Sequence, residues 1–169
     1  VMFLGAGSVM HATNDNVDMR RFGGLSKVMM FTTVTFFIGY LAILGIPPFA
    51  GFYSKDHIIE AALSHSWWAG FVVLFGAGLT AFYMTRMVVM TFFSKKRWHD
   101  DVHPHESPLS MTIPMIVLAI GSTFIGIVLT QNHALEHWLE PVTGFSEPEP
   151  PFSILTITLI TLSVVAVGV

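Results

Sequence analysis

The chain has 169 residues, of which 53% are hydrophobic and 11% are charged, and its formal net charge is −3. The charged fraction lies well below the roughly 25% found in soluble domains, which argues for lipid as the solvent. The absence of cysteine excludes disulfides, thiolate metal sites, Fe–S clusters held by this chain and a cysteine nucleophile.

Apolar runs divide the chain into membrane spans, each of which needs roughly 20 mostly apolar residues. We predict spans at 1–10 (the end of a helix), 28–66 (broken near 47–54), 67–93, 111–130 and 152–169 (the start of a helix). Both termini fall inside apolar runs, so we expect the chain to be a fragment of one transmembrane domain. The predicted fold is all-α: a polytopic, multi-pass transmembrane helix bundle that contains one discontinuous helix.

Basic residues are concentrated in two loops and predict the orientation of the chain. They are Arg20, Arg21 and Lys27 in the first loop, and Lys95, Lys96 and Arg97 in the loop at 94–110. If 28–66 crosses the membrane once, both loops lie on one face. That face is cytoplasmic, because cytoplasmic loops carry an excess of Lys and Arg. The acidic loop at 131–151 then lies outside.

The segment at 45–56, with the sequence GIPPFAGFYSKD, interrupts an apolar run. Pro47 and Pro48 remove two backbone donors and disfavour helical geometry at the residue before them. Ser54 is predicted to be the N-cap of a second half-helix, whose first residue is then Lys55. Non-helical backbone at membrane depth is found against protein or wet cavities and marks ion sites in transporters. The segment is therefore the main candidate for a functional site.

Lys55 is the leading candidate for a proton relay. A charge at bilayer depth costs on the order of 2.5–3.5 kcal/mol and requires a partner, water or a neighbouring helix. Burial and the positive end of the helix dipole disfavour the protonated amine, whereas the carboxylates of Asp56 and Glu60 favour it. These opposing effects predict a lysine that gains and loses a proton, with Asp56 in the relay and with His57 and Glu60 as second-rank members. The alternative is that Lys55 extends to the membrane interface as a structural charge.

Arg86 is the second basic residue inside an apolar run. It lies seven residues before the end of the run at 67–93, which places it roughly 10 Å deep at a helical rise of about 1.5 Å per residue. It can reach the interface or pair with a carboxylate on another helix. A structural role is therefore favoured over a direct role in the proton relay.

The histidines do not predict a metal site. His99, His103 and His105 share a polar loop with two aspartates, but their spacing matches no standard pattern, and His133 and His137 lack a third ligand. No phosphate loop, nucleotide fingerprint or Ser/His/Asp arrangement is present. We therefore expect no metal, no bound cofactor and no nucleic-acid partner for this chain.

Four segments carry a resemblance to a known family: FLGAGSV at 3–9, DMRRFGGL at 18–25, GIPPFAGFYSKD at 45–56 and AFYMTRM at 81–87. In them the chain resembles the antiporter-like, proton-translocating subunit L family (chain-5 type) of bacterial NADH–quinone oxidoreductase, respiratory complex I. The resemblance covers most of the chain, and its most specific part is 45–56. It implies a multi-pass subunit of the bacterial inner (plasma) membrane with two inverted repeats, each containing a broken helix.

The resemblance also implies a function. Protons cross the membrane through buried charged residues and water, and Lys55 matches the family's broken-helix lysine, with Asp56 beside it. NADH oxidation and quinone reduction are expected in other subunits, which hold FMN and the Fe–S clusters, so NADH and quinone bind elsewhere. The expected partners are the other complex I membrane subunits, the lipid bilayer and protons.

Two alternatives stay open at this point. One is the large subunit of a multisubunit cation/proton antiporter or of a membrane hydrogenase, which shares the fold and has related ion chemistry. The other is a membrane scaffold whose charges serve only packing. The lysine that follows the two prolines argues against the scaffold.

Overall fold

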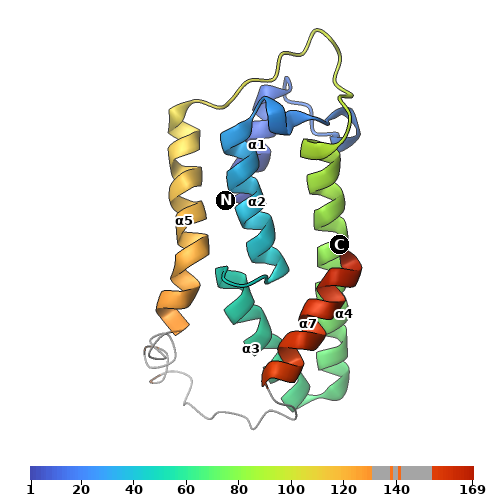
Figure 1. The fold of residues 1–169 in the computed structure, drawn as a ribbon, viewed down its shortest axis with the longest axis vertical. Helices are drawn as coiled ribbons and strands as arrows, with labels where there is room; N and C mark the ends of the chain where they lie inside the picture. The colour runs from blue at the N-terminus through green and yellow to red at the C-terminus, as the bar shows by residue number, and fades with distance from the viewer. Residues whose placement is uncertain (131–137, 139–140, 142–153) are drawn as a thin grey trace. The chain divides into compact units, whose positions relative to one another are not determined.

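The computed structural model describes residues 1–130, 138, 141 and 154–169, and no strand occurs in these ranges. The α-helices are α1 (Met2–Ala12), α2 (Met30–Leu44), α3 (Ala50–His65), α4 (Trp67–Val88), α5 (Leu109–Thr130) and α7 (Ile154–Gly168), all visible in Figure 1. Two short 3-10 helices, η1 (Met19–Arg21) and η2 (Leu25–Lys27), lie between α1 and α2, and a π-helical turn, η3 (Val89–Phe93), continues α4. The prediction of an all-α fold is confirmed for the described residues.

Two of these helices are long and apolar enough to cross a membrane by length and composition. They are α4 together with η3, at 27 residues and a mean hydropathy of 1.6, and α5, at 22 residues and a mean hydropathy of 2.2. Large apolar side chains such as Phe71, Phe75 and Val117 are exposed on them. Such a surface requires lipid or other apolar helices around it, because water disfavours exposed hydrocarbon.

Residues 1–41 and 83–121 form one compact unit. Its fully buried side chains include Leu25, Met29, Phe92 and Met115. The rings of Phe36 and Phe92 lie with centroids 5.2 Å apart, which joins α2 to η3. Tyr40 and Thr85 share a hydrogen bond of 2.7 Å, which joins α2 to α4.

The loop before α5 is attached to the beginning of α2 in this unit. The carboxylate of Glu106 accepts hydrogen bonds from the backbone N–H groups of Phe31 and Thr32, at 2.8 and 3.2 Å, and from the Thr32 hydroxyl. Ser8 on α1 shares hydrogen bonds with Thr32 and with Ser107. The first N–H groups of a helix have no intrahelical partner, so Glu106 acts as an N-terminal cap supplied from a distant part of the chain.

Residues 42–82 and 122–169 form the second unit. In it α3 packs against α7, where Ile59 and Ile157 are almost fully buried, with 1% and 3% of their surface exposed. Gly126 on α5 lies against Ala50 and Tyr53 of α3, with no room for a β-carbon. Small side chains allow helix backbones to approach each other closely in this way.

The connection between α2 and α3 lies at residues 45–49, earlier than the predicted interval near 47–54. Gly45 has a φ of 76°, a left-handed conformation that glycine adopts without strain, and it follows directly after the last residue of α2. Gly51 lies so close to the carbonyl oxygen of Ala42 that a β-carbon there would overlap it.

The prediction that Ser54 caps α3 is wrong. The helix begins at Ala50, its N-cap is Phe49, and Ser54 is an exposed residue inside the helix. In the turn before the helix, the N–H group of Phe49 donates to the carbonyl of Ile46, and in the first helical turn that of Phe52 donates to the carbonyl of Phe49, at 3.0 Å each. The helix grows directly from these turns and needs no side-chain cap.

Candidate functional site

Lys55 is the sixth residue of α3, not the first, and it is half-buried. Its Nζ donates a hydrogen bond to the backbone carbonyl oxygen of Leu44, the last residue of α2, at 3.2 Å. The final carbonyls of a helix lack intrahelical partners and carry the negative end of the helix dipole. The amine of Lys55 is therefore held at the end of one helix while its backbone belongs to the next.

The carboxylate of Asp56 contacts a different helix, α7. Its Oδ2 accepts a hydrogen bond of 2.8 Å from the hydroxyl of Thr158 on α7. Among the described residues Lys55 and Asp56 form no ion pair, as expected for adjacent helical residues, whose side chains do not face each other. The two opposite charges thus lie close in sequence but have separate partners.

His57 and Glu60 form the third contact on α3. Nδ1 of His57 lies 3.6 Å from Oε2 of Glu60, an ion pair only when the imidazole is protonated. His57 is exposed, with 61% of its side-chain surface accessible, whereas Glu60 is at 17%. The structure therefore joins the second-rank candidates to each other through the i, i+3 spacing of one helix face.

Arg86 belongs to the other unit. Its exposed side chain borders a cavity of about 570 Å³ that Asp18 and Arg20 also line. Asp18 is paired with Arg20, whose Nε lies 3.0 Å from Oδ1, and the hydrogen bond from Arg20 lowers the pKa of that carboxyl below its ordinary value. No ion pair of Arg86 occurs among the residues that the structure describes.

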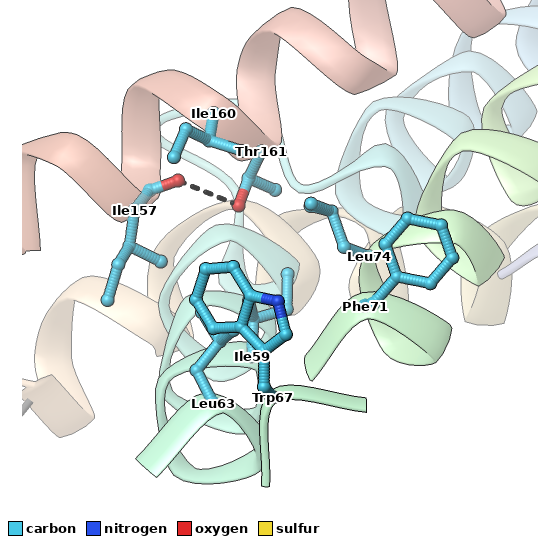
Figure 2. Close-up of a pocket in the computed structure, with 8 residues that line it drawn as sticks. All are labelled: Ile59, Leu63, Trp67, Phe71, Leu74, Ile157, Ile160 and Thr161. Atoms are coloured by element: carbon cyan, nitrogen blue, oxygen red, sulfur yellow. Dashed lines mark hydrogen bonds between the residues drawn. The ribbon is translucent and has the colours of Figure 1, made fainter. Parts of the chain in front are cut away.

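An apolar cavity of about 140 Å³ lies where α3, α4 and α7 meet (Figure 2). Its lining residues are Ile59, Leu63, Trp67, Phe71, Leu74, Ile157, Ile160 and Thr161. The hydroxyl of Thr161 donates to the carbonyl of Ile157 in its own helix, at 2.9 Å. All of these described lining residues except Thr161 are hydrophobic, so the α3–α7 contact beside Asp56 is largely apolar.

Six of the eight histidines lie in the described part of the chain. No group of three His, Cys, Asp or Glu side chains that could hold a metal ion occurs in the described part of the chain. His105 contacts His11 edge-on, with ring centroids 6.1 Å apart. His133 and His137 lie outside the described residues.

Sequence reasoning did not identify two members of the site, Thr158 and the Leu44 carbonyl. Threonine in an apolar helix is a weak signal, because its hydroxyl usually bonds to a carbonyl one turn earlier in the same helix. Thr161 does this, whereas Thr158 does not. The carbonyl of Leu44 carries no side-chain signal, and only the exact end of α2 would have pointed to it.

The sequence of the chain is similar to proteins of one known family. The family described as NADH:quinone oxidoreductase/Mrp antiporter, TM, matches residues 1–80. The chain is 52% identical to NADH-quinone oxidoreductase subunit L of Mycobacterium tuberculosis, over 99% of this chain and 27% of that protein. It is 44% identical to the subunit L of Rhodobacter capsulatus, over 76% of this chain and 20% of that protein.

The similarity extends beyond these bacterial proteins. The chloroplastic NAD(P)H-quinone oxidoreductase subunit 5 of Chaetosphaeridium globosum is 41% identical over 82% of this chain and 24% of that protein. The chain therefore spans about a quarter of the length of the curated relatives it matches.

Proposed function

We infer the function of the chain from the family to which it belongs, the antiporter-like membrane subunits of the NADH:quinone oxidoreductase/Mrp antiporter family. The chain is therefore part of a membrane protein. We propose that it carries part of a proton-translocating route across the membrane. The relatives are named as subunits of NADH-quinone oxidoreductases. We propose the same complex for this chain, in which it performs no redox chemistry itself.

The observation that carries the proposal is the position of the Lys55 amine. It donates to the carbonyl of Leu44 at the end of α2, although Lys55 itself belongs to α3. We propose that α2 and α3 together form one broken membrane crossing. Within the described residues, the half-buried amine of Lys55 has one hydrogen-bond partner, a backbone carbonyl, and no ion pair. Release of its proton therefore breaks no direct ion pair with these residues, whereas a contact ion pair would hold the proton on the amine.

In this proposal Asp56 is the countercharge to Lys55. His57 and Glu60 form a contact of their own further along α3, and they are second-rank members of the route because His57 is exposed. Arg86 serves as a structural charge in the other unit.

The direct test replaces Lys55 in the full-length subunit within the assembled complex. Lys55→Ala should leave the complex assembled but reduce NADH-driven proton uptake in membrane vesicles by at least tenfold, since the ionisable group is gone. Electron transfer should fall with it if the two are tightly coupled. Lys55→Arg should rescue poorly, because guanidinium does not release its proton.

Subunit content is checked first in each variant. Full proton uptake by an assembled Lys55→Ala complex would remove Lys55 from the mechanism. Good uptake by Lys55→Arg, together with poor assembly of Lys55→Ala, would make the lysine a structural charge.

The rest of the complex follows from the same proposal. We propose that the protein lies in the bacterial inner membrane among other complex I membrane subunits and lipid. NADH, quinone, FMN and the Fe–S clusters are then bound by other subunits, and this chain holds no cofactor. Purified complex that contains the full-length subunit should oxidise NADH with a quinone as acceptor.

A second candidate is the large subunit of a multisubunit cation/proton antiporter, because the matching family includes Mrp antiporters. The two candidates differ in what co-purifies with the full-length subunit. Co-purification with NADH-oxidising subunits supports the oxidoreductase. Co-purification with small membrane subunits alone, together with cation-driven proton exchange in vesicles, supports the antiporter.

A further inference from the structure

The carboxylate of Asp56 is fixed by a helix distant in sequence. The hydroxyl of Thr158 on α7 donates to Oδ2 of Asp56 at 2.8 Å, across 102 residues of sequence. Both side chains are half-buried. The contact lies within one compact unit, at the closely packed pair α3 and α7.

Thr158 and Thr161 both lie on α7, but their hydroxyls have different kinds of partner. The hydroxyl of Thr161 donates to the carbonyl of Ile157, the ordinary bond of a threonine one turn into a helix. The hydroxyl of Thr158 donates across to α3 instead. One threonine of α7 thus bonds to a carbonyl of its own helix, and the other bonds to a carboxylate on α3.

The two charged groups on α3 have separate partners on two other helices. The Lys55 amine lies on the carbonyl of Leu44, and the Asp56 carboxylate is held by Thr158. An opposite charge in direct contact favours the protonated amine strongly, whereas a charge held at a greater distance favours it less. The position of Asp56 therefore sets how strongly its negative charge acts on the Lys55 amine.

We propose that Thr158 is a positioning residue for the proton relay. Its hydroxyl holds the Asp56 carboxylate in an orientation turned toward α7, and so fixes the distance between this countercharge and the Lys55 amine. The proposal rests on the proposed function of Lys55. It adds α7 to the elements that set the behaviour of the site.

The surroundings of this bond support the assignment. Ile59 lies one turn beyond Asp56 on α3 and Ile157 is next to Thr158 on α7, and both line the apolar cavity of Figure 2. A hydrogen bond in apolar surroundings competes with little water and holds its geometry better than an exposed one. The Thr158 hydroxyl can therefore fix the carboxylate in one orientation.

The experiment uses the full-length subunit in the assembled complex and measures NADH-driven proton uptake in vesicles as a function of pH. Thr158→Val keeps the shape of the side chain but removes the hydroxyl. It should shift the pH profile of proton uptake, because the Asp56 carboxylate loses the contact that fixes its position relative to the Lys55 amine. Thr158→Ser keeps a hydroxyl and should follow the wild-type profile.

Thr161→Val is the matched control, since it removes a hydroxyl from the same helix without touching Asp56. It should leave the pH profile unchanged. An unshifted profile for Thr158→Val overturns the proposal, as does an equal shift for Thr161→Val. Lower subunit content without a change of profile gives Thr158 a packing role only, which also overturns it.

The outcomes also separate this proposal from the function on which it rests. Full pumping by Lys55→Ala would remove the proton relay itself. Loss of pumping in Lys55→Ala together with an unshifted Thr158→Val would leave the relay in place and remove only the role of Thr158.

Discussion

Lys55 and Asp56 are neighbours in the chain, but the fold gives them different partners. The amine contacts a backbone carbonyl of α2, and the carboxylate contacts a hydroxyl of α7. An i, i+1 pair on a helix cannot form the close ion pairs available at i, i+4, so each charge needs a partner from another element. The functional expectation for Lys55 depends on this separation.

Arg86 allows a test of a structural charge at the level of one residue. Arg86→Lys should keep assembly and most proton uptake, because the positive charge and the long apolar stem remain. Arg86→Ala should lower the amount of assembled complex several-fold, as a loss of about 1–2 kcal/mol in stability does for many proteins. Both are measured as subunit content by quantitative immunoblot and as proton uptake per assembled complex.

The same experiment tests whether Arg86 is a weaker candidate for the proton relay than Lys55. If Arg86→Ala assembled normally and lost proton uptake, the arginine would belong to the relay and not to the structural charges.

At the scale of elements, α2 depends on a residue far away in the chain. Glu106 accepts two backbone N–H groups and one hydroxyl at the beginning of α2. Glu106→Ala leaves these donors without their acceptor and should lower the free energy of unfolding by about 1–2 kcal/mol. The measurement is the thermal midpoint of the purified complex that contains the full-length subunit.

Asp100→Ala is the matched control for Glu106. Asp100 lies in the same loop and pairs with Lys96 at 2.9 Å, but its side chain is 99% exposed. An exposed pair of this kind contributes little to stability, so this variant should behave as wild type. Equal effects of the two variants would mean that Glu106 does not cap α2.

The start of α3 shows how tertiary contacts override a local preference. Serine is among the residues most favoured as an N-cap, yet the helix passes through Ser54 and begins four residues earlier. The consecutive turns at 46–52 provide the first hydrogen bonds, and the close approach of Gly51 to Ala42 fixes where the helix lies relative to the end of α2. Lys55 is consequently more than one turn inside the helix, and the helix dipole acts on it less than predicted.

At the scale of the whole molecule, the distribution of basic residues predicts topology. Because this chain has no cysteine, single cysteines can be introduced at Asp101, in the basic loop, and at Trp138, in the acidic loop, both of which are exposed. In a full-length protein without other accessible cysteines, position 101 should react with a membrane-impermeant thiol reagent from the cytoplasmic side. Position 138 should react from outside.

Labelling of intact cells and of inverted vesicles distinguishes the two faces. The same accessibility at both positions would contradict the single broken crossing at 28–66 and the predicted orientation together.

The sequence by itself determined the helical character of the described chain, its membrane class, its family and the leading candidate residue. These properties are local: apolar runs, helix-breaking prolines and an ionisable group inside an apolar segment can all be read from neighbouring residues. The family followed from local motifs as well, above all from the segment at 45–56.

Only the tertiary structure decided which groups the candidate residues contact. Thr158 reaches Asp56 across 102 residues, and Glu106 reaches Phe31 across 75. Such contacts depend on how the helices pack, because a hydroxyl or a carboxylate can bond to its own helix, to water or to a neighbour, and the sequence alone does not distinguish these partners. Tertiary structure also decided where α3 starts and where the Lys55 amine lies. Both depend on the turns and close backbone contacts that join α3 to the end of α2.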